Sequence, residues 1–239
     1  KADIIFTLDF NSLQRIGDME APLTVSKAIK IMIDHHQQPD DYATYMYSDV
    51  MMSSTCQMVY HFIEMLDDLE QIDTDVATCL YAGLLTDTGS FRYPTTTSKT
   101  HHVAADLIKK GANHSEIYNA IYDANSYDRL QLLGRALSNL KVLPEYRTAY
   151  ITLTQDELNS FHFKKGDTEG FVNYGLSIKN IVFAIIFIEH KQEGIVKVSL
   201  RSKGPFSVNE FSRAHFGGGG HDNAAGGKSD LSLDDTVAK

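Results

Sequence analysis

Two short apolar runs, each followed at once by a carboxylate, constrain the fold of this chain more than any other feature. Residues 2–8 lead into Asp9, and residues 30–33 lead into the triplet Asp34-His35-His36. Short apolar runs rich in β-branched residues are typical of buried parallel strands. Pro22 can open a short helix over 23–29 between them. We therefore expect Asp9 and the triplet at one edge of a parallel sheet, where open α/β sheets bind ligands.

The triplet offers oxygen and nitrogen ligands at the point where a strand meets solvent. A lone pair of histidines more often only forms hydrogen bonds in a loop, so the triplet needs support from elsewhere. Thr86-Asp87-Thr88-Gly89 supplies it, because Asp87 ends an apolar helix and precedes a turn that would hold its carboxylate rigidly. Arg92 follows in the same loop, where it could meet an anion or, equally, pair with surface acids.

The charge of the chain limits its partners. The 239 residues carry a formal net charge of −9, with 22 Lys and Arg against 31 Asp and Glu. Long duplex nucleic acid needs a surplus of basic residues, so we expect a short phosphorylated substrate instead. No apolar run approaches the roughly 20 residues that span a bilayer, and we expect a cytoplasmic protein without a membrane partner. Cys56 and Cys79 lie in apolar helical patterns and are expected to be reduced core residues.

The remaining periodicity predicts two α/β domains. In the first, 44–48 is expected to be a third strand, and helices are expected at 55–66, from Asp73 or Thr74 to Asp87, and from Thr97 or Ser98 to 110. His101 and His102 fall inside the last helix, where adjacent side chains diverge by about 100° and cannot share one ion. Residues 127–143 read as one long amphipathic helix that ends before Pro144 and bridges the domains. Strands at 150–153, 181–188 and 195–200 and a helix at 208–216 follow. The expected boundaries are 1–125, a linker helix at 126–145, and a smaller domain at 146–239.

A run of four glycines, Gly217 to Gly220, precedes His221 and the small residues 224–226. Glycines cost backbone entropy, so a folded chain keeps them where side chains would obstruct something. We expect their exposed amides to line a phosphate site, with a helix or turn beginning at 224–226. A flexible linker is the alternative, and Arg201 at the end of the preceding strand makes it less favoured.

These motifs together resemble the DHH phosphoesterase family. Asp9, the triplet and Thr86-Asp87-Thr88-Gly89 resemble its second, third and fourth motifs, and the glycine run with His221 resembles the DHH-associated C-terminal domain. Residues 169–173 and 198–202 are most similar to the bifunctional oligoribonucleases that also act as phosphatases on 3′-phosphoadenosine 5′-phosphate (pAp). The family's first motif, a His and two Asp on a glycine-containing loop, is absent. We therefore expect a fragment that, by itself, binds manganese poorly and is nearly inactive.

The resemblance implies two divalent metal ions, usually Mn²⁺, and a role for each matching residue. Asp9 would bridge the ions, His35 and Asp87 would ligate one ion, Asp34 would orient a ligand, and His36 would face the scissile phosphate. Arg201 and His221, with the amides of Gly218, Gly219 and Gly220, would grip the nucleotide.

The implied function is hydrolysis of short oligoribonucleotides, known as nanoRNA, and of pAp. A cyclic-dinucleotide phosphodiesterase and a catalytically incomplete nucleotide-binding module are the alternatives. A pyrophosphatase is less favoured, because its compact, highly charged substrate calls for a second domain richer in Lys and Arg. Whether the chain forms a homodimer stays open.

Overall fold

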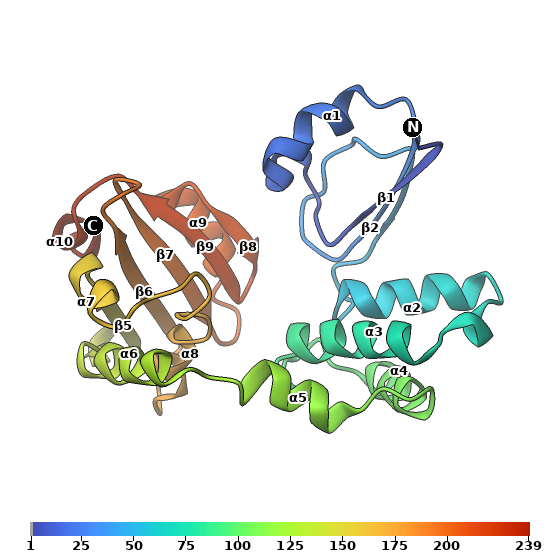
Figure 1. Cartoon of the computed structure of the whole chain (residues 1–239). Coiled ribbons are helices and arrows are strands. Elements are labelled where there is room, and N and C mark those ends of the chain that lie inside the picture. Colours follow the sequence, from blue (N-terminus) through green and yellow to red (C-terminus); the bar gives the residue numbers. More distant parts are fainter. Residues whose placement is uncertain (1) are drawn as a thin grey trace. The chain divides into compact units, whose positions relative to one another are not determined.

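The computed structural model describes residues 2–239, which form two compact units that meet between Ala124 and Asn125 in the sequence (Figure 1). Each unit has its own sheet and its own apolar core. The first sheet is parallel and the second is mixed. This is the α/β architecture that the sequence predicted.

The first unit begins with the three-stranded parallel sheet, in the order β1-β2-β3. Its strands are β1 (Ile4–Leu8), β2 (Ile29–Asp34) and β3 (Tyr45–Ser48). Between β1 and β2 lie η1 (Leu13–Met19) and α1 (Glu20–Val25). The predicted helix at 23–29 is therefore placed too late. Ile29 already belongs to the sheet, because its N–H donates to the carbonyl of Asp3 over 2.9 Å.

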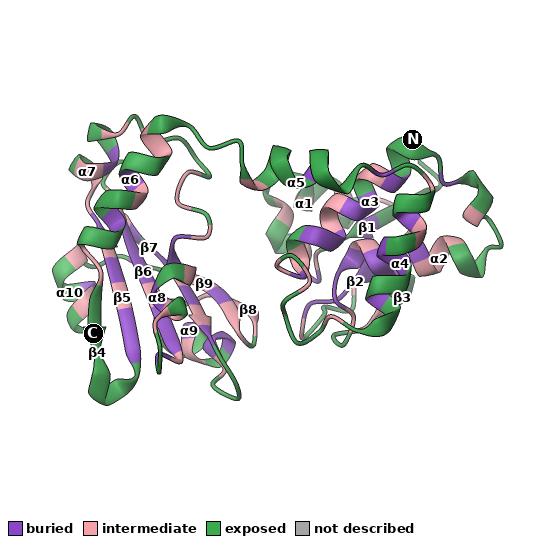
Figure 2. Ribbon diagram, turned by 90° about the horizontal axis from the view of Figure 1, so that it is seen from below, coloured by how far each residue is buried: buried purple, intermediate pink, exposed green. Residues whose placement is uncertain are grey.

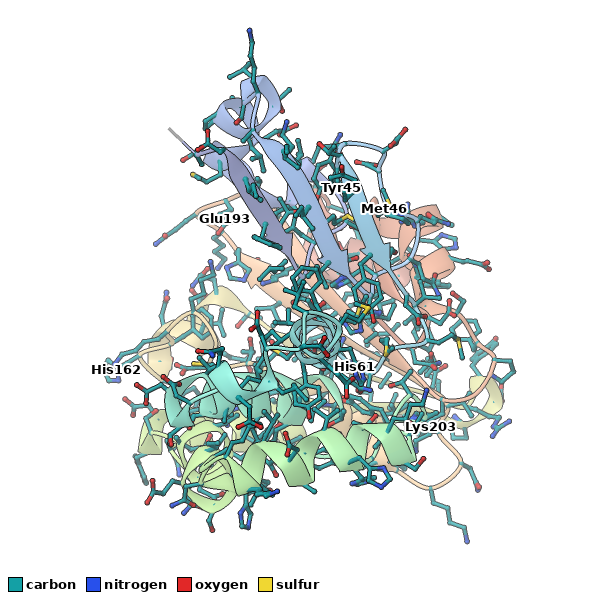
Figure 3. The ribbon with its side chains drawn as sticks, turned by 90° about the vertical axis from the view of Figure 1, so that its right-hand side faces the viewer. Tyr45, Met46, His61, His162, Glu193 and Lys203 are labelled. Atoms are coloured by element: carbon teal, nitrogen blue, oxygen red, sulfur yellow. The ribbon has the colours of Figure 1, made fainter. Side chains whose placement is uncertain are left out.

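The first strand is not buried on both faces, which corrects the prediction. Ile4, Phe6 and Leu8 on β1 are 52%, 48% and 42% exposed, whereas Thr7 is 1% exposed. Figure 3 shows Tyr45 and Met46 on β3, which are also exposed. Nothing in the sequence indicated this exposure. The exposed side chains of β1 are apolar, whereas the buried side chain, Thr7, is polar.

Five helical segments complete the first unit: α2 (Thr55–Met65), η2 (Leu69–Gln71), α3 (Thr74–Asp87), α4 (Ser98–Lys109) and α5 (His114–Tyr122). The predicted helix starts are confirmed by side-chain caps from Ser54, Asp73 and Thr97. Leu84 and Leu107 are fully buried where α3 and α4 meet. Cys79 is exposed on α3, so the prediction that it lies in the core is wrong.

The second unit is built on a six-stranded sheet in the order β4-β5-β6-β7-β9-β8. Its strands are β4 (Lys141–Leu143), β5 (Thr148–Leu153), β6 (Phe183–His190), β7 (Ile195–Ser202), β8 (Gly219–His221) and β9 (Ala224–Ser229). Only β5 and β6 pair in parallel. Figure 2 shows the central strands buried and the edge strand β4 exposed.

The helical segments of the second unit are α6 (Tyr127–Ser138), η3 (Pro144–Tyr146), α7 (Gln155–Ser160), α8 (Val172–Ser177), α9 (Val208–Phe216) and α10 (Leu233–Ala238). The predicted helix at 208–216 is confirmed. The single long helix at 127–143 is wrong, because α6 ends at Ser138 and residues 141–143 pair with β5 instead. Leu132 and Ala136 are fully buried in the core of this unit.

Across residues 2–239, none of the helices combines the length and the apolar character that crossing a membrane requires.

Candidate active site

Asp9 directly follows β1 and has a left-handed backbone, with φ of 64°. Residues other than glycine adopt this conformation at an energetic cost, so contacts must hold it in place. The N–H of Asp9 donates to the carbonyl of Ile33 on β2 over 3.2 Å. The hydroxyl of Thr55, at the start of α2, donates to Asp9 Oδ1 over 2.8 Å. The backbone and the carboxylate of Asp9 are thus held separately.

Asp34 ends β2 and is fully buried, with both carboxylate oxygens turned to His36. Oδ2 accepts from the backbone N–H of His36 over 2.8 Å, and Oδ1 accepts from Nδ1 over 2.7 Å. Burial alone would raise the pKa of Asp34, but the hydrogen bonds and the charge of His36 outweigh it and hold the pKa below its usual value. Asp34 therefore stays ionised and fixes the ring of His36.

His35 is oriented from its other side by the main chain. Its Nδ1 lies 3.1 Å from the carbonyl oxygen of Met52, which can only accept a hydrogen bond. In the neutral ring the proton is therefore on Nδ1 and the lone pair is on Nε2. Nε2 lies 3.7 Å from Asp9 Oδ1 and 3.7 Å from Asp87 Oδ2.

Asp87 is the last residue of α3 and completes this group. Burial, and then the negative charge of Asp9, raise the pKa of Asp87 to about 6. A nearby cation would stabilise the ionised form of a carboxyl group held in this way. The C-terminal cap of α3 is made by Thr88, whose backbone N–H donates to the carbonyls of Leu84 and Thr86, and not by the side chain of Asp87.

Asp9, His35 and Asp87 present one ligand atom each within 4.8 Å of one another. Two carboxylate oxygens and one imidazole nitrogen form a donor set that fits a divalent ion such as Mn²⁺. A metal-binding histidine also typically donates its other ring N–H to a group such as a backbone carbonyl, as Nδ1 of His35 does to Met52. The residues present therefore fit the metal that the sequence implied.

Some residues at this edge were not identified from the sequence. Thr55 was placed only near a helix start, and no local pattern pointed to Asp9, 46 positions away. Asn11 was assigned no role, yet it is buried, and its Nδ2 donates to the carbonyl of Gln37, directly after the triplet, over 2.6 Å. The available signal for this contact was that Asn11 and Gln37 are polar and each follows one of two adjacent strands.

Arg92 lies in the loop after Asp87 and is exposed. Its guanidinium carbon lies 5.4 Å from the centre of the Tyr93 ring, a cation–π distance. Its substrate role stays a prediction.

The glycine run of the second unit forms an edge strand. Gly217 is the left-handed C-cap of α9, and Gly219–His221 form β8, which pairs antiparallel with residues 224–226 of β9. The predicted helix or turn at 224–226 is wrong, because these residues continue as β9. As the outer strand of the described sheet, β8 presents backbone groups along its free edge.

Close packing requires two of these four glycines, Gly218 and Gly220. A Cβ on Gly218 would lie 1.8 Å from the carbonyl oxygen of Gly226, and one on Gly220 would lie 2.4 Å from that of Ala224. A Cβ on Gly219 would instead meet Arg213 and Asn209 at 3.5 Å, an ordinary contact. Gly219 is therefore the glycine in β8 that the fold itself does not require.

Arg201 and His221 lie in this second unit on β7 and β8. Arg201 is partly buried, donates to the carbonyl of Leu200 over 3.0 Å, and lies 3.9 Å from Glu169 Oε1. Because Glu169 is 82% exposed at its side chain, this ion pair is weak and can exchange for a ligand anion.

Two protein-family models match this chain. Residues 2–84 match the DHH family, N-terminal domain, and residues 148–238 match the DHHA1 domain. The bifunctional oligoribonuclease and PAP phosphatase NrnA of Bacillus subtilis is 30% identical over 93% of this chain and 69% of its own length. A probable NrnA of Streptococcus mutans is 33% identical over 95% of this chain and 70% of its own length. The chain belongs to the DHH family.

A solved structure extends the comparison to the fold. An exopolyphosphatase-related protein from Bacteroides fragilis is 39% identical, with a TM-score of 0.94 over all of this chain and 69% of the solved one. A cyclic-di-AMP phosphodiesterase GdpP of Geobacillus thermodenitrificans is a more distant relative, 27% identical over 85% of this chain and 30% of its own length. By family, the chain is a hydrolase of phosphate esters.

Proposed function

We propose that the protein is a metal-dependent phosphodiesterase that hydrolyses short oligoribonucleotides and removes phosphate from pAp. The observation that carries this proposal is the convergence of Asp9, His35 and Asp87, whose ligand atoms lie within 4.8 Å of one another at the end of the parallel sheet. The NrnA relatives support the substrate class, because their names state both activities.

In this proposal, Asp9, His35 and Asp87 hold divalent ions, two in number and Mn²⁺ in kind. Bound ions would supply Lewis acidity toward a phosphoryl group and lower the pKa of water. His36 is the substrate-facing group, because Asp34 accepts from its Nδ1 and so directs the opposite side of the ring away from the buried carboxylate. Asp34 acts through His36, since both of its oxygens already accept from that residue.

The nucleotide is held by other residues in the proposal. Arg92 meets a phosphate in the first unit, and Arg201, His221 and the backbone of Gly218–Gly220 serve the second. The net charge of −9 favours short substrates, because long nucleic acid would be repelled by the surface away from these few cations. A cytoplasmic location, where such short RNAs arise, and a homodimer belong to the same proposal.

A cyclic-dinucleotide phosphodiesterase is the second candidate, and the GdpP relative favours it. Both candidates use the same metal ligands, so the site alone does not separate them. The substrate does.

A substrate panel separates the candidates. Native-length protein with Mn²⁺ is given a 5′-phosphorylated RNA dinucleotide, pAp and cyclic di-AMP, and product release is followed by chromatography. We expect the dinucleotide and pAp to be hydrolysed faster than cyclic di-AMP, and Asp87→Ala to abolish all three activities. Faster hydrolysis of cyclic di-AMP would select the second candidate, and an active Asp87→Ala variant would contradict the metal assignment.

A further inference from the structure

Thr55 is the first residue of α2, and its hydroxyl donates to Asp9 Oδ1 over 2.8 Å. The residue is only 4% exposed, so water has little access to replace this acceptor. The bond therefore joins the start of a helix to a proposed metal ligand that follows a strand.

The helix itself does not need the Thr55 hydroxyl. The capping position of α2 belongs to Ser54, whose side chain accepts from the N–H of Gln57 over 3.0 Å. A Thr hydroxyl in a helix can hydrogen-bond to its own or neighbouring backbone groups. In this protein it is directed at a carboxylate outside the helix, which suggests a task at the site.

That task follows from the geometry of Asp9. Its backbone is held in the left-handed region and tied to β2, but its side chain is 54% exposed and would otherwise be free to sample other rotamers. Thr55 binds the oxygen, Oδ1, that also lies 3.7 Å from His35 Nε2. One donor leaves the second lone pair of Oδ1, and all of Oδ2, available to cations.

We infer that Thr55 is a positioning residue that fixes the Asp9 carboxylate in the orientation that binds divalent ions. This inference rests on the proposed function, because it assumes that Asp9 is a metal ligand. Thr55 itself touches neither the substrate nor the metal; it acts only through Asp9. Hydrogen-bond partners of metal ligands commonly change metal affinity by about 10- to 100-fold.

Titration with Mn²⁺ alone tests the inference. Free Mn²⁺ is followed by electron paramagnetic resonance in native-length protein and in Thr55→Val, Thr55→Ala and Thr55→Ser. Val keeps the shape and removes the hydroxyl, Ala removes the hydroxyl without placing a methyl group against the carboxylate, and Ser restores the donor. We expect the Kd for Mn²⁺ to rise about tenfold or more in the Val and Ala variants, and the Ser variant to bind like the parent.

Thr74→Val is the matched control, because Thr74 is the first residue of α3 and its hydroxyl donates to the carbonyl of Lys110 over 3.3 Å. Its melting temperature without metal is expected to fall as much as that of Thr55→Val, while its Mn²⁺ affinity stays at the parent value. Unchanged affinity in both the Val and Ala variants of Thr55, failure of Ser to restore binding, or an equal loss in Thr74→Val would each overturn the inference. If the parent itself bound no Mn²⁺, the proposed function would fail first, and the two failures are thereby told apart.

Discussion

At the scale of one residue, the negative charge of Asp87 lowers the stability of the folded, metal-free protein. It lies at the C-terminal end of α3, where the helix dipole disfavours negative charge, and it faces a second carboxylate, Asp9. Its pKa of about 6 records the cost of ionising it in the metal-free protein. A structure selected only for stability would place an uncharged residue there.

We expect Asp87→Asn to stabilise the metal-free protein at neutral pH. The pKa of Asp87 is raised on folding, so its contribution to stability is greatest below about pH 4 and is lost as the pH rises through 6. At pH 7.5 the parent carries the full cost, about 1 kcal/mol after allowing for solvent screening of a side chain that is 35% exposed. Thermal unfolding in a chelator at pH 7.5 and pH 4 measures it.

The variant should melt a few degrees higher than the parent at pH 7.5, and the two should converge near pH 4. A difference in melting temperature that is independent of pH, or a variant that melts lower at pH 7.5, would show that ionised Asp87 does not destabilise the folded protein.

Single residues were predictable from the sequence where a strand or helix ended in a polar side chain. Asp9, His35 and Asp87 were predicted as site residues in this way, and the structure brings their ligand atoms within 4.8 Å of one another; their roles stay predictions. Thr55 and Asn11 were not found, because their partners are distant in sequence and no local pattern encodes a hydrogen bond across elements. The distances among the ligands also depend on how α2 packs against β2 and α3, which periodicity does not describe.

At the scale of one element, the glycines of β8 and the one just before it differ in whether packing requires them. Gly218 and Gly220 have no room for a Cβ, whereas Gly219 does. A glycine kept without a steric need is consistent with close approach of a ligand to the backbone.

We therefore expect Gly219→Ala to fold like the parent but to bind the substrate more weakly. Its melting temperature should stay within about a degree, and its KM for pAp should rise severalfold with kcat little changed, because a methyl group on β8 hinders the nucleotide. Steady-state kinetics and thermal unfolding measure both quantities.

Gly218→Ala is the comparison for this experiment. The contact of 1.8 Å with the Gly226 carbonyl should lower its melting temperature strongly. An unchanged KM in Gly219→Ala would show that the substrate does not closely approach the backbone of β8.

Other elements show why periodicity misleads. Residues 127–143 keep a helical spacing of leucines, yet α6 ends at Ser138 and residues 141–143 pair with β5 as the edge strand β4. The apolar run of β1 predicted burial on both faces, but only the face that carries Thr7 turns inward. Helix starts were predicted well, since Ser, Asp and Thr caps act locally.

At the scale of the whole molecule, the candidate metal ligands and the glycine-rich strand belong to different units. The parallel sheet of the first unit carries the candidate metal ligands, and the mixed sheet of the second carries the glycine-rich strand. The order of motifs along the chain predicted this division, because each motif follows its own strand or helix. A net charge of −9 is consistent with cations concentrated at the site and with short, phosphorylated substrates.

The most direct test of the metal site is a crystal of native-length protein grown with MnCl₂ and measured at the manganese absorption edge. We predict anomalous density within coordinating distance of Asp9, His35 Nε2 and Asp87, and its loss at the Asp87 position in Asp87→Ala crystals. Manganese bound elsewhere, or no anomalous density beside these three residues at a Mn²⁺ concentration that supports hydrolysis, would contradict the account.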